Sequence, residues 1–182
     1  MKKKKIQIIS LLSILLFCCF VTGCGNNDEN IVNEQSPVTT KNTILDDIDV
    51  SGSGKLFCTR DAFGKEGMDV ELTYELEYKN GFVSILHANE KVISNNSDDL
   101  DEYENAYRNI AKNYKGLKYY DITITRDENS VVNDTLINYE KIDTDKLLDI
   151  EGREDNVIVD GKLKLETWVS FAEQFGTRCK EV

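Results

Sequence analysis

The sequence predicts an α+β domain built on an antiparallel sheet. Apolar and polar residues alternate strictly over residues 68–78, which indicates a strand with one buried and one exposed face. Asn80 and Gly81 follow at once, and this pair is typical of the tight turn that joins two antiparallel strands. Residues 98–115 then change to a helical period, and further strands follow, which is the order typical of the α+β class.

Four further segments read as strands. An opening strand is expected over residues 55–60, and residues 82–93 return from the Asn-Gly turn. Residues 119–126 and 131–139 form a second predicted hairpin, with its turn in the polar segment between them. The expected sheet therefore consists of two hairpins plus an opening strand.

The helical segments follow from apolar residues spaced three and four apart. The long helix over residues 98–115 has acids in its first turns and bases late, as the helix dipole prefers, and Gly116 can end it. A short helix is expected over residues 145–150, and a C-terminal helix ends at Gly176. We expect the long and the C-terminal helix to pack on the sheet.

The first 23 residues have the three parts of a bacterial lipoprotein signal peptide. Residues 2–5 are lysines, a positive block of the kind that stays on the cytoplasmic side. Residues 6–20 are mostly apolar, and these 15 residues are too few for a bilayer-spanning helix, which needs about 20. An aliphatic residue, two small residues and a cysteine follow, in the manner of a lipobox: Val21, Thr22, Gly23 and Cys24.

Cys24 is the predicted site of lipid attachment and the predicted first residue of the mature chain. A thiolate is a strong nucleophile, which suits it to accept a diacylglyceryl group. Cys18 and Cys19 lie in the apolar segment and are expected to leave with the signal peptide. The expected location is the extracytoplasmic side of the cell membrane, with the acyl chains on Cys24 held in the bilayer. The alternative is an uncleaved membrane anchor, against which the short apolar segment argues.

Residues 24–54 are polar and contain Pro37, the only proline, so a flexible tether is predicted ahead of one domain over residues 55–182. The formal charge is −11 at pH 7, and removal of residues 1–23 takes away four lysines and no acid, which gives −15. So acidic a chain argues against nucleic acid as a partner. The negative charge of the chain is compatible with the binding of cations or of basic partners.

Cys58 and Cys179 are the cysteines that the mature chain keeps besides Cys24. They lie near the two ends of the domain, and an exported protein meets an oxidising environment, so a disulfide between them is predicted. Such a bond closes a loop of roughly 120 residues, worth up to ~4–5 kcal/mol in the chain-entropy model. The alternative is two buried free thiols.

The order of these features resembles a known family over about residues 55–181. The residues that carry the resemblance are Cys58, the strand 70–78 with Asn80 and Gly81, Tyr114, Lys115 and Gly116, Asn138 and Tyr139, Leu147 and Leu148, and Gly176, Thr177, Arg178, Cys179 and Lys180. This layout is similar to that of the YehR-like family of small bacterial lipoproteins. The resemblance implies a lipobox and a single α+β domain; it implies no established activity, so no catalytic residue is carried over.

No catalytic set, metal-binding set or cofactor motif stands out in the domain. His87 is the only histidine, and its place within a predicted strand indicates an ordinary side chain rather than a catalytic base. Three acidic clusters lack the calcium-loop pattern, so solvated acids are expected there and no metal site or cofactor is predicted. These clusters are Asp46, Asp47 and Asp49; Asp98, Asp99, Asp101 and Glu102; and Glu151, Glu154 and Asp155.

Tyr103, Tyr107 and Tyr114 share one face of the long predicted helix. Aromatic residues at helical spacing usually belong to a core. The alternative is a groove for a peptide or a glycan, with these rings as its binding face.

We expect a non-catalytic, membrane-anchored lipoprotein whose domain binds an envelope protein or a surface component. The alternative is a small-solute or cation-binding lipoprotein that serves a membrane transporter, although about 130 residues are few for a two-lobed binding protein. A hydrolase is the third hypothesis, against which the missing catalytic set argues.

Overall fold

The structure is a computed structural model that describes residues 45, 49–64, 66–153 and 156–182. The predicted signal peptide, Cys24 and most of the predicted tether lie outside the described residues, as do Glu154 and Asp155 of the third acidic cluster. Within the described part, no helix has the length and apolar character needed to cross a membrane.

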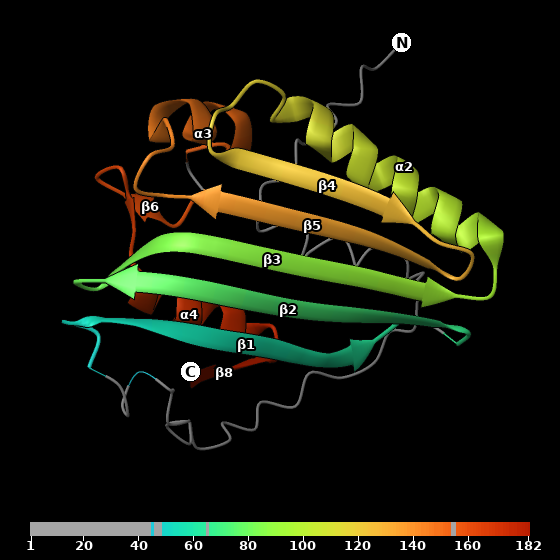
Figure 1. Cartoon of the computed structure of the whole chain (residues 1–182), viewed down its shortest axis with the longest axis horizontal. Helices are drawn as coiled ribbons and strands as arrows, with labels where there is room; N and C mark the ends of the chain where they lie inside the picture. Colours follow the sequence, from blue (N-terminus) through green and yellow to red (C-terminus); the bar gives the residue numbers. More distant parts are fainter. Residues whose placement is uncertain (1–44, 46–48, 65, 154–155) are drawn as a thin grey trace, which may run out of the picture.

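A six-stranded sheet forms the body of the domain (Figure 1). Its strand order is β4-β5-β3-β2-β1-β8, and every neighbouring pair is antiparallel. The predicted hairpins are β2–β3 and β4–β5, and β1 is the opening strand. The bounds are β1 (Ser53–Phe63), β2 (Met68–Lys79), β3 (Phe82–Ser94), β4 (Tyr120–Arg126), β5 (Ser130–Asn138) and β8 (Thr177–Glu181).

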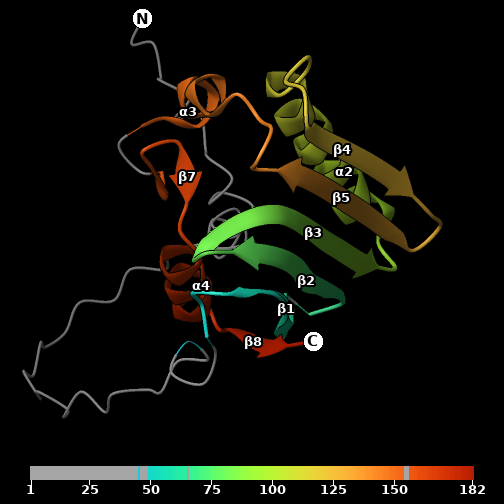
Figure 2. The ribbon, with the colours of Figure 1, turned by 60° about the vertical axis from the view of Figure 1, so that its left-hand side comes forward.

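The helices pack on one face of this sheet, the inner face (Figure 2). No described helix covers the opposite face of the sheet, which we call the open face. Figure 1 is viewed from the side of the open face, so α4 lies behind β1 and β2. A separate two-stranded hairpin, β6–β7, completes the helical layer. The predicted α+β class with an antiparallel sheet is confirmed. The bounds are α2 (Ser97–Asn113), α3 (Thr144–Glu151), α4 (Leu165–Gln174), β6 (Ile158–Val159) and β7 (Lys162–Leu163).

The β2–β3 hairpin forms as its alternation predicts. Every second side chain of β2 is buried from residue 68 to residue 78, and those between are exposed or half-buried. Asn80 and Gly81 have positive φ angles of 52° and 78°, which is the backbone of a two-residue turn that matches the twist of antiparallel strands. The predicted turn is confirmed.

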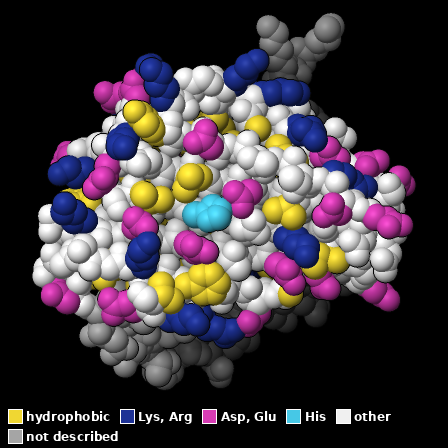
Figure 3. Space-filling view, viewed as in Figure 1, with side chains coloured by type: hydrophobic (Ala, Val, Ile, Leu, Met, Phe, Trp, Pro, Cys, Tyr) yellow, Lys and Arg dark blue, Asp and Glu magenta, His cyan; other side chains and the backbone are white. Residues whose placement is uncertain are grey.

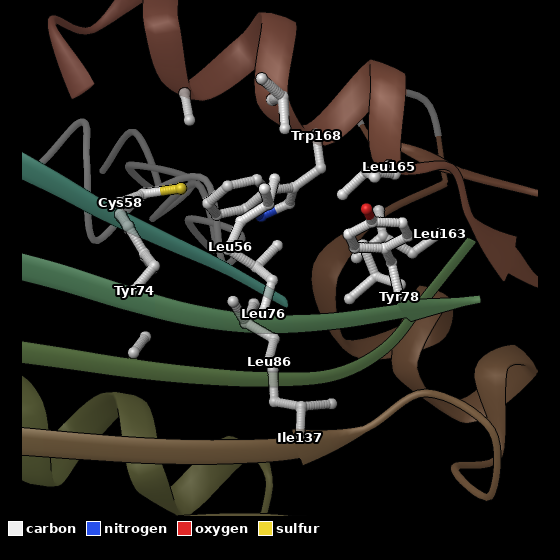
Figure 4. Close-up of a cluster of buried hydrophobic side chains, with 14 of the residues drawn as sticks. Leu56, Cys58, Tyr74, Leu76, Tyr78, Leu86, Ile137, Leu163, Leu165 and Trp168 are labelled. Carbon is white, nitrogen blue, oxygen red and sulfur yellow. The ribbon is translucent and has the colours of Figure 1, made fainter. Parts of the chain in front are cut away.

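The larger apolar cluster, the α4 cluster, lies between the sheet and α4 (Figure 4). Leu56, Leu76, Leu86 and Ile137 lie directly opposite one another on four neighbouring strands and are at most 2% exposed. Trp168 of α4 packs into the same cluster. Burial of each aliphatic side chain contributes about 1.5–3 kcal/mol to stability, so this cluster fixes the helix on the sheet.

A smaller apolar cluster, the α2 cluster, joins α2 to the other end of the inner face. The Asn96 side chain caps α2 by accepting a hydrogen bond from the Asp98 amide, which satisfies one of the free N–H groups of the first turn. Three buried residues of α2 then meet apolar residues of β2, β3 and β5. The members are Met68, Val70, Val92, Leu100, Tyr103, Tyr107 and Val131.

The edge strand β8 was not predicted, because its five residues are mostly polar and show no alternation of their own. Within it, Cys179 lies directly opposite Cys58 of β1, and the two form a disulfide. The predicted pairing is therefore confirmed. The bond fastens the C-terminal edge of the sheet to the first strand.

The domain also begins earlier than predicted. β1 starts at Ser53, the Asn80 amide donates a hydrogen bond to the Gly52 carbonyl, and Val50 packs against the α4 cluster. The last residues assigned to the tether therefore belong to the folded domain.

Candidate functional site

One row of inward-facing residues is largely polar, whereas apolar clusters lie on both sides of it. Strand pairing places Arg60, Leu72, Glu90 and Asn133 directly opposite one another on β1, β2, β3 and β5, and Thr177 of β8 lies beyond Arg60. Glu90, Asn133 and Thr177 are 4%, 4% and 2% exposed. We call these five residues the polar row; it separates the α2 cluster from the α4 cluster.

Three side chains of the polar row keep a buried polar atom that has no hydrogen-bond partner among the described residues. These atoms are Nη1 of Arg60, Oε2 of Glu90 and Oγ1 of Thr177. Most buried polar atoms in folded proteins are hydrogen-bonded, and an unsatisfied one costs about 1–3 kcal/mol. Their concentration in one row indicates a region of the core that is not arranged for stability alone.

A small pocket, the sheet pocket, opens beside the polar row between the sheet and the helical layer. Its volume is about 50 Å³, which is room for a few water molecules or for one small chemical group. Two carboxyl side chains line it, Glu90 from β3 and Glu151 from the end of α3. Much of the remaining wall is apolar or aromatic: Leu72, Leu86, Ala88, Tyr139, Trp168 and Phe171.

Burial dominates the electrostatics of Glu90. It raises the pKa of this carboxyl from 4.5 to about 7, because a charge is poorly solvated inside the protein. The nearby Tyr107 hydroxyl and the charge of Arg60 lower the pKa, but by less. Glu90 therefore gains and loses its proton near neutral pH.

Glu151 is held by defined hydrogen bonds. The Tyr114 hydroxyl donates to its Oε1 over 3.3 Å, and the Asn156 amide donates to its Oε2 over 2.5 Å. Burial raises the pKa of Glu151 to about 7, against a smaller lowering by these two bonds. The expectation of solvated acids is wrong for Glu151, which is only 6% exposed because α3 packs its last turn onto the core.

Tyr103, Tyr107 and Tyr114 do not form the open binding face considered above. They are 7%, 5% and 5% exposed, because their side of α2 faces the sheet. Tyr114 stacks on Tyr120 with 4.2 Å between ring centroids, and burial raises the pKa of both hydroxyls, which keeps them neutral donors. This burial agrees with the core placement expected for these rings and not with the alternative of an open groove. The Tyr114 hydroxyl donates a hydrogen bond to Glu151 of the sheet pocket, and Tyr107 lies beside Glu90.

His87 lies near the centre of the open face (Figure 3). Its Nε2 is 2.9 Å from Oδ2 of Asp134, and the Asn89 side chain donates to the same oxygen. The His87 and Asp134 side chains are 37% and 40% exposed. Among the described residues no hydroxyl or thiol hydrogen-bonds to this imidazole, so the pair is a cross-strand contact on the surface.

The described residues contain no group of three or more His, Cys, Asp or Glu side chains placed to hold a metal ion. In the second acidic cluster, Asp99 accepts a hydrogen bond from Ser94, and Asp101 forms an ion pair with Arg126 at 3.3 Å. The first and third clusters lie partly outside the described residues.

Comparison with known proteins concerns the fold only. No family model matches the chain, and no curated protein matches it significantly. The structure is similar to the NMR structure of the E. coli YehR protein, with 15% identity and a TM-score of 0.49 over 72% of this chain and 92% of that one. It is also similar to the NMR structure of a protein from Streptococcus pneumoniae TIGR4, with 12% identity and a TM-score of 0.45 over 88% of this chain and 100% of that one. YehR is also the name of the family that the layout of the sequence resembles.

Proposed function

We propose that this protein is a lipoprotein anchored through acylated Cys24 on the extracytoplasmic side of the cell membrane. The lysine block at residues 2–5, the short apolar segment 6–20 and the lipobox-like residues before Cys24 support the anchor. The Cys58–Cys179 disulfide is consistent with it, because such bonds persist mainly outside the cytoplasm.

The domain, in this proposal, binds a small solute in the sheet pocket without catalysing a reaction. The observation that carries the proposal is Glu90, which is 4% exposed, lines an otherwise largely apolar pocket and has one carboxyl oxygen without a described partner. A purely structural core gains nothing from such a group, because an apolar side chain there costs no desolvation. A ligand that donates a hydrogen bond to it compensates for this cost.

The pocket favours a solute over a docked protein. About 50 Å³ admits a small molecule or one end of a larger one, and the tyrosines considered as the alternative binding face are buried. The segment between Cys24 and the folded domain has about 25 residues and extends to at most ~90 Å, which is long enough to bring a bound solute to a membrane partner such as a transporter.

A thermal-shift panel on the full-length protein in detergent tests this function. The panel contains small amines, carboxylic acids, sugars and amino acids, and a compound that binds the folded protein raises the melting temperature by an amount that grows with the ratio of its concentration to its Kd. We expect at least one compound to stabilise the protein, with a smaller effect in Glu90→Gln and an unchanged effect in Glu166→Gln, an exposed glutamate of α4. A panel without any shift, or with equal shifts in both variants, contradicts the proposal.

A further inference from the structure

We propose that the sheet pocket recognises an alkylammonium group, the cationic end of a small organic amine. This inference rests on the proposed function, because it names the chemical class of ligand for the same pocket. Three independent features of the wall point to it: an unpaired acceptor, an excess of negative charge and several aromatic rings.

The unpaired acceptor is Oε2 of Glu90. It is buried, it belongs to a residue that lines the pocket, and no described group donates a hydrogen bond to it. The matching group on a ligand is therefore a donor. An ammonium carries three N–H donors and no acceptor, so it satisfies a carboxylate without introducing a new unpaired atom.

The charged side chains in the wall of the sheet pocket are all acidic. Glu90 and Glu151 line the pocket, whereas none of its described lining residues is a lysine, an arginine or a histidine. Arg60 attracts Glu90 along the polar row but does not belong to the wall. A cation that enters makes the ionised form of both carboxyls favourable, and an anion meets repulsion in a medium of low dielectric constant.

Aromatic rings complete the site. Tyr139, Trp168 and Phe171 line the same pocket, and the faces of such rings attract cations. The volume of about 50 Å³ suits a primary ammonium with a short alkyl stem better than a bulky ring. A chain with a charged head and an apolar stem thus matches both parts of the wall.

Calorimetric titration of the full-length protein in detergent at pH 8 tests the inference with three probes of similar size: butylammonium, butanol and butyrate. We expect saturable binding of butylammonium alone. Glu90→Gln and Glu151→Gln should each weaken it about tenfold or more, because the acceptor loses the negative charge that strengthens its hydrogen bond to the ammonium. Glu166→Gln is the matched control and should bind as the wild type does.

A second variant tests the pocket without changing the charge of Glu90 or Glu151. Ala88→Val narrows the pocket, leaves both carboxyls in place and suits a strand position, so it should abolish binding and retain the fold. Equal binding of butanol or butyrate overturns the choice of a cation but leaves a small-solute function standing. Unchanged binding in Glu90→Gln, or binding of none of the three probes, also overturns the inference, and the wider thermal-shift panel then decides the proposed function by itself.

Discussion

Leu72 of β2 and Glu90 of β3 lie directly opposite each other on the inner face of the sheet, and both are buried, at 2% and 4% exposed. The leucine is an ordinary core residue. The carboxyl beside it is costly to ionise, and its pKa is raised to about 7 for that reason. The centre of the domain therefore carries a proton-binding group next to its apolar core.

Replacement of Glu90 by glutamine should remove a pH dependence of stability. Between pH 4.5 and about 7, the folded protein keeps a proton on Glu90 that the unfolded chain has released, so stability falls as the pH rises through this window. The loss amounts to at most about 3 kcal/mol above pH 7. We expect Glu90→Gln to melt close to the wild type at pH 4.5 and several degrees above it at pH 8, as measured by circular dichroism.

The exposed Glu166→Gln variant serves as the control for this experiment and should follow the wild type at both pH values. An equal difference in melting temperature at pH 4.5 and pH 8 would show that the effect of Glu90→Gln does not come from its ionisation.

Much of the fold could be predicted from the sequence, because its long elements carry strong local patterns. The alternation in β2, the turn at Asn80 and Gly81 and the helical period of α2 each specify one element without knowledge of the rest. β8 is different, since its place beside β1 depends on a tertiary pairing and a disulfide. The hairpin β6–β7 was not predicted, because each of its strands has only two residues. Its turn was visible in the sequence, since Asp160 and Gly161 are a residue pair typical of hairpin turns.

The site could be predicted only in part. Glu90 shares the strand period of Leu86, Ala88 and Val92, so its inward direction was available from the sequence. Its place beside the pocket was not, because α3 and α4 reach the sheet from distant parts of the chain. Glu151 lies in an acidic stretch between exposed Asp149 and exposed Arg153, and the packing of α3 shows that it is buried.

Calcium should not bind tightly to this protein. The described residues offer no cluster of acidic ligands, and the acid runs in the sequence lack the calcium-loop pattern. Calorimetric titration of the full-length protein with calcium chloride is expected to show no site tighter than ~0.1 mM. A saturable micromolar site would contradict this prediction, and it would place metal ligands among residues outside the described part of the chain.

Removal of the disulfide should lower stability but preserve the fold. The bond closes a loop across a sequence separation of 121 residues, so its loss costs up to ~4–5 kcal/mol in the chain-entropy model. The α4 cluster is otherwise intact in Cys58→Ala/Cys179→Ala, and we expect this variant to melt several degrees lower with an unchanged circular dichroism spectrum. Mass spectrometry of the unreduced, alkylated wild type checks the premise; alkylation of both cysteines in protein from the cell envelope would contradict it.

The lipid anchor predicts a specific result for Cys24. The thiol of this residue is the proposed acceptor of the diacylglyceryl group, and an alanine offers no nucleophile in its place. We expect Cys24→Ala to accumulate as an unprocessed precursor or to leave the membrane fraction, as shown by detergent partitioning and intact mass. Cys19→Ala is the control, because Cys19 lies in the segment that is removed, and its product should match the mature wild type in mass and location. A Cys24→Ala protein that stays in the membrane and still carries the mass of the acyl chains would show that the lipid is attached elsewhere.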